Sequence, residues 1–194
     1  MAAAVAALQA GEAVVVPTDT VYGVAALPSV DGATQRLFAL KERAGDHPLA
    51  VLVSESERAL ALVEAPTDAV HELMARAWPG PLTVVLRRAP SARSLELGGD
   101  DVTIGLRCPD HGLLLDLLAR VGPLATTSAN RHGQPTPVTA AAAAAALSGP
   151  VAMVLDGGRC AGQPSTVVDC TVTPWRVLRA GAFAIDGAGG PSRP

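Results

Sequence analysis

Aromatic residues are scarce in this chain of 194 residues: they make up 3% of it, whereas hydrophobic residues of all kinds make up 49%. The core must therefore be built from leucine, valine and alanine. Long apolar runs are also missing, since no stretch reaches the roughly 18 unbroken apolar residues of a membrane span. The apolar start, MAAAVAALQAGEAVVVP, has no basic residue and is interrupted by Gln9 and Glu12, which favours a helix over a secretory signal. We therefore expect a cytoplasmic protein with no membrane partner.

Positive charge is limited too. Fifteen Lys and Arg residues face eighteen Asp and Glu residues, which gives a net charge of −3 and a pI near 5.8. This balance argues against wholesale nucleic-acid binding, which needs a basic face, but it is compatible with a local cationic pocket. Lysine occurs once, as Lys41, and asparagine and tyrosine also occur once each, as Asn130 and Tyr22.

Metal-binding and common catalytic signatures are absent. No CxxC pair and no complete set of Cys and His ligands at zinc spacing occurs, so we expect reduced, mostly buried thiols and no protein-held metal. The cysteines and histidines concerned are Cys108, Cys160, Cys170, His47, His71, His111 and His132. The sequence also lacks GxxxxGK[ST], GxGxxG, GxSxG and HExxH, which excludes the usual P-loop, Rossmann, nucleophile-elbow and zinc-peptidase patterns.

Helical and strand patterns alternate along the chain, so the sequence predicts an α/β fold with a mixed sheet. We expect one domain over residues 1–186, followed by a flexible tail at 187–194. Asp31 is the expected cap of one helix, and Ser54 with Glu57 form the expected capping box of the next. The predicted helices cover 2–10, 32–43, 54–63, 68–78, 113–121 and 138–147, and the predicted strands 13–16, 48–53, 82–88, 102–107, 124–127, 151–155, 166–171 and 176–179.

The stretch VVVPTDTVYGV at Val14–Val24 is the centre of the candidate chemistry. Three valines predict a buried strand that ends at Pro17, and hydroxyl and carboxylate side chains follow directly. One interpretation is purely structural, a strand followed by a polar turn. The alternative is that these polar side chains form the rim of a binding or catalytic site at the end of the strand. Several strand ends, this one included, carry small hydroxyl or cationic residues, namely Thr18, Thr20, Thr103, Arg107, Thr126, Thr127, Ser128, Ser165, Thr166 and Arg179.

Hydroxyl and guanidinium groups of this kind suit an anionic substrate, as in phosphoryl or nucleotidyl transfer. Each residue also has a structural explanation. Threonine and arginine are ordinary in strands, and the Ser-Ala-Asn at 128–130 suits a turn. Lys41 and Arg43 are at the C-terminal end of the helix predicted at 32–43, where a cation complements the helix dipole and stabilises the helix by only about a few tenths of a kcal/mol.

A family resemblance favours the functional alternative. In order, the chain contains PTDTVYG at 17–23, KER at 41–43, WPGPLT at 78–83, TIGLRCP at 103–109, TTSAN at 126–130, STVVD at 165–169 and LRAG at 178–181. This ordered set resembles the bacterial threonylcarbamoyl-AMP synthases of the YrdC/Sua5 family over nearly the whole chain. We expect the single-domain form, since the chain leaves no room for the additional domain of the longer Sua5 type.

The resemblance implies a twisted α/β sheet around a large concave cavity. It also implies an enzyme, a nucleotidyltransferase that joins L-threonine, bicarbonate and ATP into threonylcarbamoyl-AMP and pyrophosphate. Other proteins would then use the product to form N6-threonylcarbamoyladenosine (t6A) in tRNA, so tRNA binding by this chain should be weak or indirect. Mg²⁺ would arrive on the ATP phosphates rather than in a protein cage.

The resemblance further assigns roles by motif. Lys41 and Arg43 are the expected catalytic pair, and Arg107 suits a bidentate grip on the carboxylate of threonine. Two departures are His47, where relatives often have Asn, and Leu52, where some have His. The expected threonine contacts are Thr20, Arg107, Thr126 and Ser165; the expected ATP contacts are Arg43, His47, Thr103, Ser128, Asn130, Thr136 and Arg179.

Two alternatives stay open. One is an RNA-binding or ribosome-associated module with this fold, which the acidic pI and the shortage of aromatic residues argue against. The other is an enzyme of the same fold with a different acyl acceptor or none, which the K-x-R and S-x-N motifs disfavour.

Overall fold

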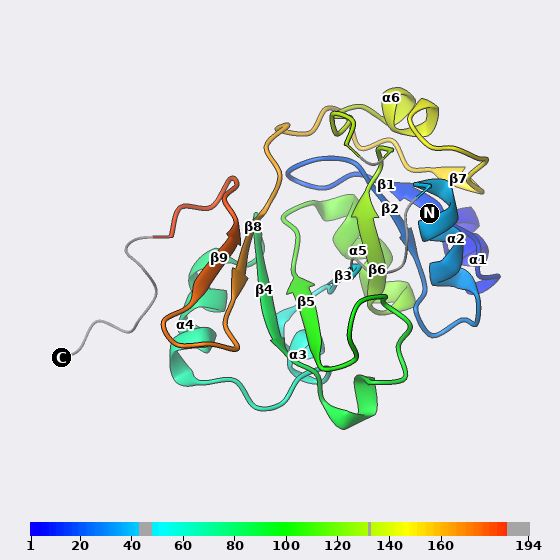
Figure 1. The fold of residues 1–194 in the computed structure, drawn as a ribbon. Helices are drawn as coiled ribbons and strands as arrows, with labels where there is room; N and C mark the ends of the chain where they lie inside the picture. Colours follow the sequence, from blue (N-terminus) through cyan, green and yellow to red (C-terminus); the bar gives the residue numbers. More distant parts are fainter. Residues whose placement is uncertain (43–47, 132, 186–194) are drawn as a thin grey trace.

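The structure, a computed structural model, describes residues 1–42, 48–131 and 133–185 (Figure 1). Its helices are α1 (Ala2–Gln9), α2 (Ala33–Leu40), α3 (Ser56–Leu60), α4 (Asp68–Ala77), α5 (Gly112–Val121) and α6 (Ala140–Ala145), with a short 3-10 helix, η1, at Pro90–Ala92. Its strands are β1 (Val14–Val16), β2 (Gly23–Ala26), β3 (Ala50–Leu52), β4 (Leu82–Arg87), β5 (Thr103–Arg107), β6 (Leu124–Ser128), β7 (Met153–Val154), β8 (Thr166–Asp169) and β9 (Arg176–Arg179).

Within the described residues the strands form one nine-stranded sheet in the order β7-β1-β2-β6-β3-β5-β4-β8-β9. The pairs β1–β7, β3–β5 and β4–β8 are parallel, and the remaining neighbours are antiparallel. The predicted α/β class with a mixed sheet is therefore confirmed. The tail predicted at 187–194 lies outside the described residues.

Strand β2 is missing from the sequence prediction. Its residues, GVAA at 23–26, show no alternation of polar and apolar side chains, because the strand is buried on both faces. It pairs with β1 on one side and β6 on the other. Its central place in the sheet therefore comes from pairing with distant strands, which local pattern does not reveal.

Both expected helix caps are wrong. The N-cap of α2 is Gly32, in the left-handed conformation with φ 76°, rather than Asp31. Helix α3 starts later than expected, with Glu55 as an N-cap that makes no side-chain capping bond, so Ser54 and Glu57 form no capping box. Both helices are fixed by the apolar faces that they bury instead. The remaining predicted elements exist with ends shifted by a few residues.

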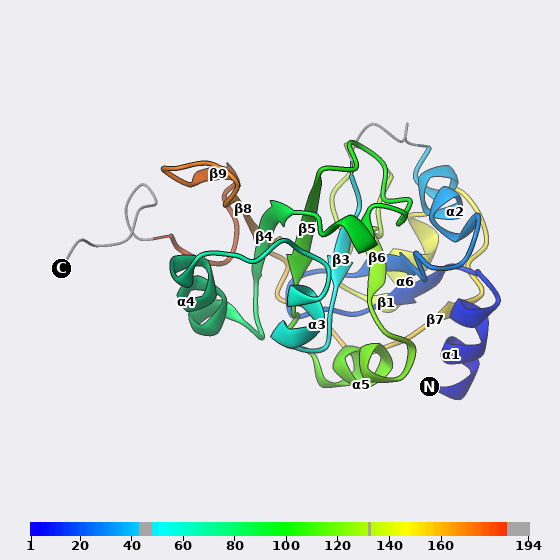
Figure 2. The same cartoon turned by 90° about the horizontal axis from the view of Figure 1, so that it is seen from below.

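The sheet is covered on both faces at its β7–β1 end. Val14 and Val16 of β1 pack with leucines of α1 and α5, whereas Val15 faces the larger cluster, which includes Leu37 of α2. Helices α1 and α5 contact one another, and Figure 2 shows both on the same side of the strands. Each fully buried valine or leucine contributes about 1.5–3 kcal/mol, so this layer is a major source of stability.

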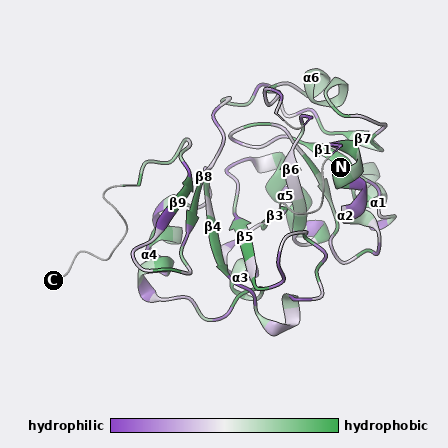
Figure 3. Cartoon of the chain, viewed as in Figure 1, coloured by the Kyte–Doolittle hydropathy of each residue, from purple (hydrophilic) through white to green (hydrophobic). Residues whose placement is uncertain are grey.

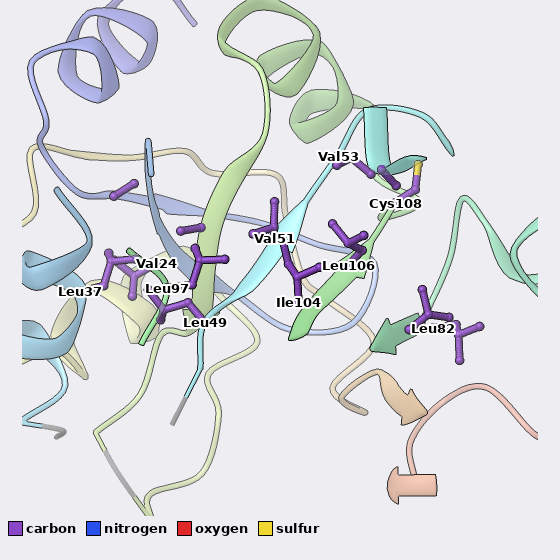
Figure 4. Packing of buried hydrophobic residues seen from close by; sticks show 14 of the residues in the cluster. Val24, Leu37, Leu49, Val51, Val53, Leu82, Leu97, Ile104, Leu106 and Cys108 are labelled. Atoms are coloured by element: carbon purple, nitrogen blue, oxygen red, sulfur yellow. The ribbon is translucent and has the colours of Figure 1, made fainter. Parts of the chain in front are cut away.

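The other half of the sheet has one apolar and one polar face. Leu82 and Val84 of β4 and Ile104 and Leu106 of β5 belong to the larger core cluster. Figure 4 shows Leu82, Ile104 and Leu106 among the packed side chains. Successive side chains of a strand point to opposite faces, so the residues between them point the other way. Figure 3 shows these central strands as largely hydrophobic ribbons. Their second face carries Thr83, Thr103 and other small or polar residues, and it forms the floor of a cavity.

Candidate active site

A cavity of about 640 Å³ lies over the polar face of β5, β4 and β8 and extends to β6 and to the segment between β1 and β2. Small side chains keep its floor open, since Gly105 lies between Thr103 and Arg107 on the cavity face of β5. A Cβ atom added at Gly105 would lie 3.5 Å from the Cγ2 of Thr83, which is an ordinary van der Waals contact. The space above this glycine is therefore large enough for an additional carbon atom. The volume is within the range of pockets that hold small organic ligands.

The structure brings most of the predicted site residues to this one cavity. Those that line it are Thr20, Thr103, Arg107, Thr126, Ser128, Thr136, Ser165 and Arg179. Lys41 and Asn130 do not form its wall but hydrogen-bond to Ser128, which does. Arg43 and His47 lie outside the described residues. Leu52, one of the two departures from the family pattern, lines the cavity and is almost fully buried.

Arg107 is a buried cation held by three different partners. Only 6% of the residue is exposed, and this burial lowers the pKa of its guanidinium. Its Nη2 donates to Oδ1 of Asp19 at 2.5 Å, its Nη1 to Oγ1 of Thr20 at 2.9 Å and its Nε to the carbonyl of Gly80 at 3.0 Å. Each terminal nitrogen thus keeps one N–H without an acceptor in the described part of the chain. That pair of donors matches a carboxylate.

Asp19 is the site residue that sequence reasoning left without a role. It supplies the negative charge that a buried arginine requires, and its Oδ1 also accepts from the backbone N–H of Asp110 at 3.2 Å. It therefore ties the segment after β1 to the end of β5. The position of Asp19 between two threonines in PTDT indicates a polar site. Its role was not predicted, because its partner, Arg107, lies 88 residues away in the sequence.

Arg179 and Ser165 form a second polar group in the cavity. The Nε and Nη2 of Arg179 donate to the backbone oxygen and the Oγ of Ser165, each at 3.0 Å. The Oγ of Ser165 also lies 2.9 Å from Oγ1 of Thr83. Burial lowers the pKa of Arg179. The cavity is therefore lined by two guanidinium groups, the buried one of Arg107 and the more exposed one of Arg179, which favours an anionic ligand.

Lys41 is the C-cap residue of α2, at the helix end where the sequence places it, but its side chain is buried there. It is only 3% exposed. Its Nζ donates to the carbonyl of Ser128 at 2.5 Å, to Oδ1 of Asn130 at 3.0 Å and to Oγ of Ser128 at 3.2 Å. The expected value of a few tenths of a kcal/mol is therefore wrong for this residue, because hydrogen bonds of a buried charge are worth about 1.5–3 kcal/mol.

Two carboxylates in the described part of the chain, those of Asp100 and Asp169, line the cavity, and both already accept hydrogen bonds. Asp100 accepts from both backbone N–H groups of residues 102 and 103 and from the hydroxyl of Thr103; these bonds, above all that of Thr103, lower its pKa. Asp169 accepts from Thr171 and Arg176. Over residues 1–42, 48–131 and 133–185 no group of three His, Cys, Asp or Glu residues could hold a metal ion.

Gly181 makes a close backbone contact that supports this site. A Cβ atom there would lie 2.3 Å from the carbonyl oxygen of Pro164 and 2.5 Å from the carbonyl carbon of Ser165. Replacing Gly181 with alanine must therefore move the backbone beneath Ser165. We expect a loss of about 1–3 kcal/mol in the free energy of unfolding, measured by denaturant or thermal unfolding.

The matched control is Gly112→Ala at the start of α5, where a Cβ atom meets nothing within 4 Å. Alanine favours a helix over glycine, so this variant should be as stable as the original protein or more so. Equal stability of the two variants would contradict the close contact at Gly181.

Comparisons with a family model and with individual proteins place the chain in the same family. The model of the Sua5_yciO_yrdC family, described as "Telomere recombination", matches residues 6–181. A putative threonylcarbamoyl-AMP synthase of Mycobacterium leprae is 41% identical over 186 residues, which cover 95% of this chain and 84% of the relative. The threonylcarbamoyl-AMP synthase of Bacillus subtilis is 36% identical over 185 residues, covering 94% of this chain and 54% of that protein.

Solved structures agree in fold. Pyrococcus abyssi Sua5 complexed with L-threonine superposes with a TM-score of 0.85 at 35% identity, over 92% of this chain and 53% of that one. The chain thus spans about half the length of that structure. Escherichia coli YciO has a TM-score of 0.84 at 24% identity, over 93% of this chain and 88% of that one, and so shows the fold alone. None of the described helices is long and apolar enough to cross a membrane.

Proposed function

Because the chain belongs to the Sua5–YciO–YrdC family, we propose that it is a threonylcarbamoyl-AMP synthase, a nucleotidyltransferase acting on L-threonine, bicarbonate and ATP. The observation that supports this most is a pair of arginines in one cavity with several hydroxyl groups: Arg107, which is buried, and Arg179, which is more exposed and hydrogen-bonded to Ser165. One guanidinium suits the carboxylate of an amino acid and the other suits a phosphate. The product would serve t6A modification of tRNA through other proteins.

The chemistry needs no nucleophile from the protein. The amine of threonine attacks the carbon of bicarbonate, a C–N bond forms, and water leaves to give a carbamate. A carbamate oxygen then attacks the α-phosphorus of ATP, the bond to the bridging oxygen of the β-phosphate breaks, and pyrophosphate leaves with that electron pair. Both partners are anionic, so positioning and positive charge supply most of the acceleration.

The residues divide by role in this proposal. Arg107 binds the carboxylate through its two remaining N–H groups, and the buried ammonium of Lys41 fixes the Ser128–Asn130 turn and adds positive charge beside the cavity. ATP enters as its Mg²⁺ complex, and the ion supplies neutralisation of the phosphate charge. The proposed threonine contacts are Thr20, Arg107, Thr126 and Ser165, and the proposed ATP contacts are Arg43, His47, Thr103, Ser128, Asn130, Thr136 and Arg179.

The test is incubation of the pure protein with ATP, Mg²⁺, bicarbonate and L-threonine, with mass spectrometry of the nucleotide products. We expect threonylcarbamoyl-AMP and pyrophosphate. Valine, a near-isostere without the hydroxyl, should give about a hundredfold less product or lower still, because a site that pairs a substrate hydroxyl rejects an analogue without it. Failure to form the adduct from threonine would contradict the synthase activity; equal yields from valine would show that the hydroxyl is not recognised.

The RNA-binding alternative is not favoured by the relatives, whose names are those of synthases. A gel-shift titration with tRNA separates the two functions. A chain of net charge −3 can neutralise few phosphates at once, so its affinity for tRNA should be weak and fall steeply with salt. Tight tRNA binding in moderate salt without ATP binding would overturn the synthase proposal. The cytoplasmic location and the downstream transfer proteins stay predictions.

A further inference from the structure

The hydroxyl hydrogen of Thr20 has a fixed direction. The Oγ1 atoms of Thr18 and Thr20 lie 2.9 Å apart, so one of them donates to the other. Thr18 donates its only hydroxyl hydrogen to the carbonyl of Val21 at 2.6 Å. Thr20 is then the donor in the pair, and Oγ1 of Thr18 accepts this hydrogen together with the backbone N–H groups of Thr20 and Val21. The oxygen of Thr20 in turn accepts an N–H of Arg107 at 2.9 Å.

Because its hydrogen is used in the bond to Thr18, the hydroxyl of Thr20 can accept a hydrogen bond from a ligand in the cavity but cannot donate one. Thr126, on β6 opposite Ala25 of β2, is in the same state, because its hydroxyl donates to the carbonyl of Val24 at 3.1 Å. Both threonine residues line the cavity. A ligand that pairs with them must bring N–H or O–H groups, whereas Arg107 beside Thr20 offers N–H groups to an anion.

An amino acid with a side-chain hydroxyl presents this combination: a carboxylate for Arg107, an amine and a hydroxyl for the two acceptors. We infer that Thr18 is a positioning residue that gives the amino-acid end of the cavity its acceptor character, by taking the hydroxyl hydrogen of Thr20. Thr18 is 5% exposed, and its Oγ1 is itself fixed by the backbone N–H groups of Thr20 and Val21, each at 3.1 Å. This inference rests on the proposed function for the identity of the amino acid.

The test compares Thr18→Val with Thr18→Ser by calorimetric titration of L-threonine and, separately, of ATP with Mg²⁺. Valine keeps the shape but removes the acceptor for the hydrogen of Thr20, so that hydrogen is free to point into the cavity against an ammonium group. We expect about tenfold weaker binding of threonine, the size of one net hydrogen bond, with the affinity for ATP unchanged. Serine retains the hydroxyl and should restore threonine binding.

Thr34→Val is the matched control, because Thr34 is equally buried but lies on α2 and outside the cavity lining. It should bind both ligands as the original protein does. The inference is overturned if Thr18→Val binds threonine normally, if Thr18→Ser fails to restore binding, or if Thr18→Val weakens threonine and ATP equally, which would indicate a structural role alone.

The titration does not depend on turnover. If the original protein binds threonine but forms no adduct, the proposed synthase function fails while the variants still test the role of Thr18. If the original protein has no measurable affinity for threonine, both are overturned.

Discussion

Replacing Lys41 with alanine is expected to lower the rate of threonylcarbamoyl-AMP formation by about a hundredfold or more, the usual effect of deleting one preorganised charged or donor group at a reacting centre. Lys41 is the only lysine in the chain, and its ammonium fixes both Ser128 and Asn130. Single-turnover rates, measured by the release of pyrophosphate, would test this. A rate close to that of the original protein would remove Lys41 from the mechanism.

A matched control separates this effect from loss of charge on the same helix. Arg36→Ala removes a cation from α2 whose side chain is 53% exposed and whose partner is Glu12 at 3.3 Å. An exposed ion pair of this kind is worth about 0–1 kcal/mol, so activity and stability should both be retained. Lys41→Ala should still bind threonine in calorimetry, because Arg107 and Thr20 are untouched; a loss of that binding would indicate a misfolded site.

Replacing Arg107 with lysine is expected to weaken threonine binding by about a hundredfold, even though the charge is kept. Lysine lacks the planar fork, so it can satisfy Asp19 but cannot at the same time bind Thr20, Gly80 and a carboxylate. Calorimetric titration with L-threonine measures the loss. ATP binding should be affected much less, since Arg179 and Ser165 remain in place.

The control for this change is Arg120→Lys, at the exposed end of α5. It should bind threonine as the original protein does. Arg107→Lys binding threonine with unchanged affinity would show that the fork is not the carboxylate site. Equal losses for threonine and ATP would instead indicate a collapse of the cavity when the buried pair with Asp19 is disturbed.

Sequence patterns predicted the fold where a strand or helix has one polar and one apolar side. The strands predicted at 82–88 and 102–107 are both present, and in TIGLR at 103–107 Ile104 and Leu106 face the core while Thr103 and Arg107 face the cavity. Strand β2 was missed because it is buried on both faces. The caps at Asp31 and Ser54 were wrong because packing, and not the local cap, determines where α2 and α3 begin.

The candidate site was predicted as a set of residues but not as a set of contacts. The family motifs identified the residues that line the cavity. They did not show that Lys41 is buried against Ser128, 87 positions later, or that Asp19 pairs with Arg107. Such contacts depend on how the strands are ordered in the sheet, and a local window of sequence holds no record of that order.

The order of the strands also determines when the cavity exists during synthesis. Strand β8, which enters between β4 and β9, comes from residues 166–169, and Arg179 comes later still. A nascent chain that has emerged only as far as β6 therefore has Thr20, Arg107 and Thr126 but lacks the Ser165–Arg179 wall. Pairings between such distant segments form slowly. A ligand held by both walls thus stabilises only the completed chain, and ligand-dependent resistance to proteolysis would report the moment of completion.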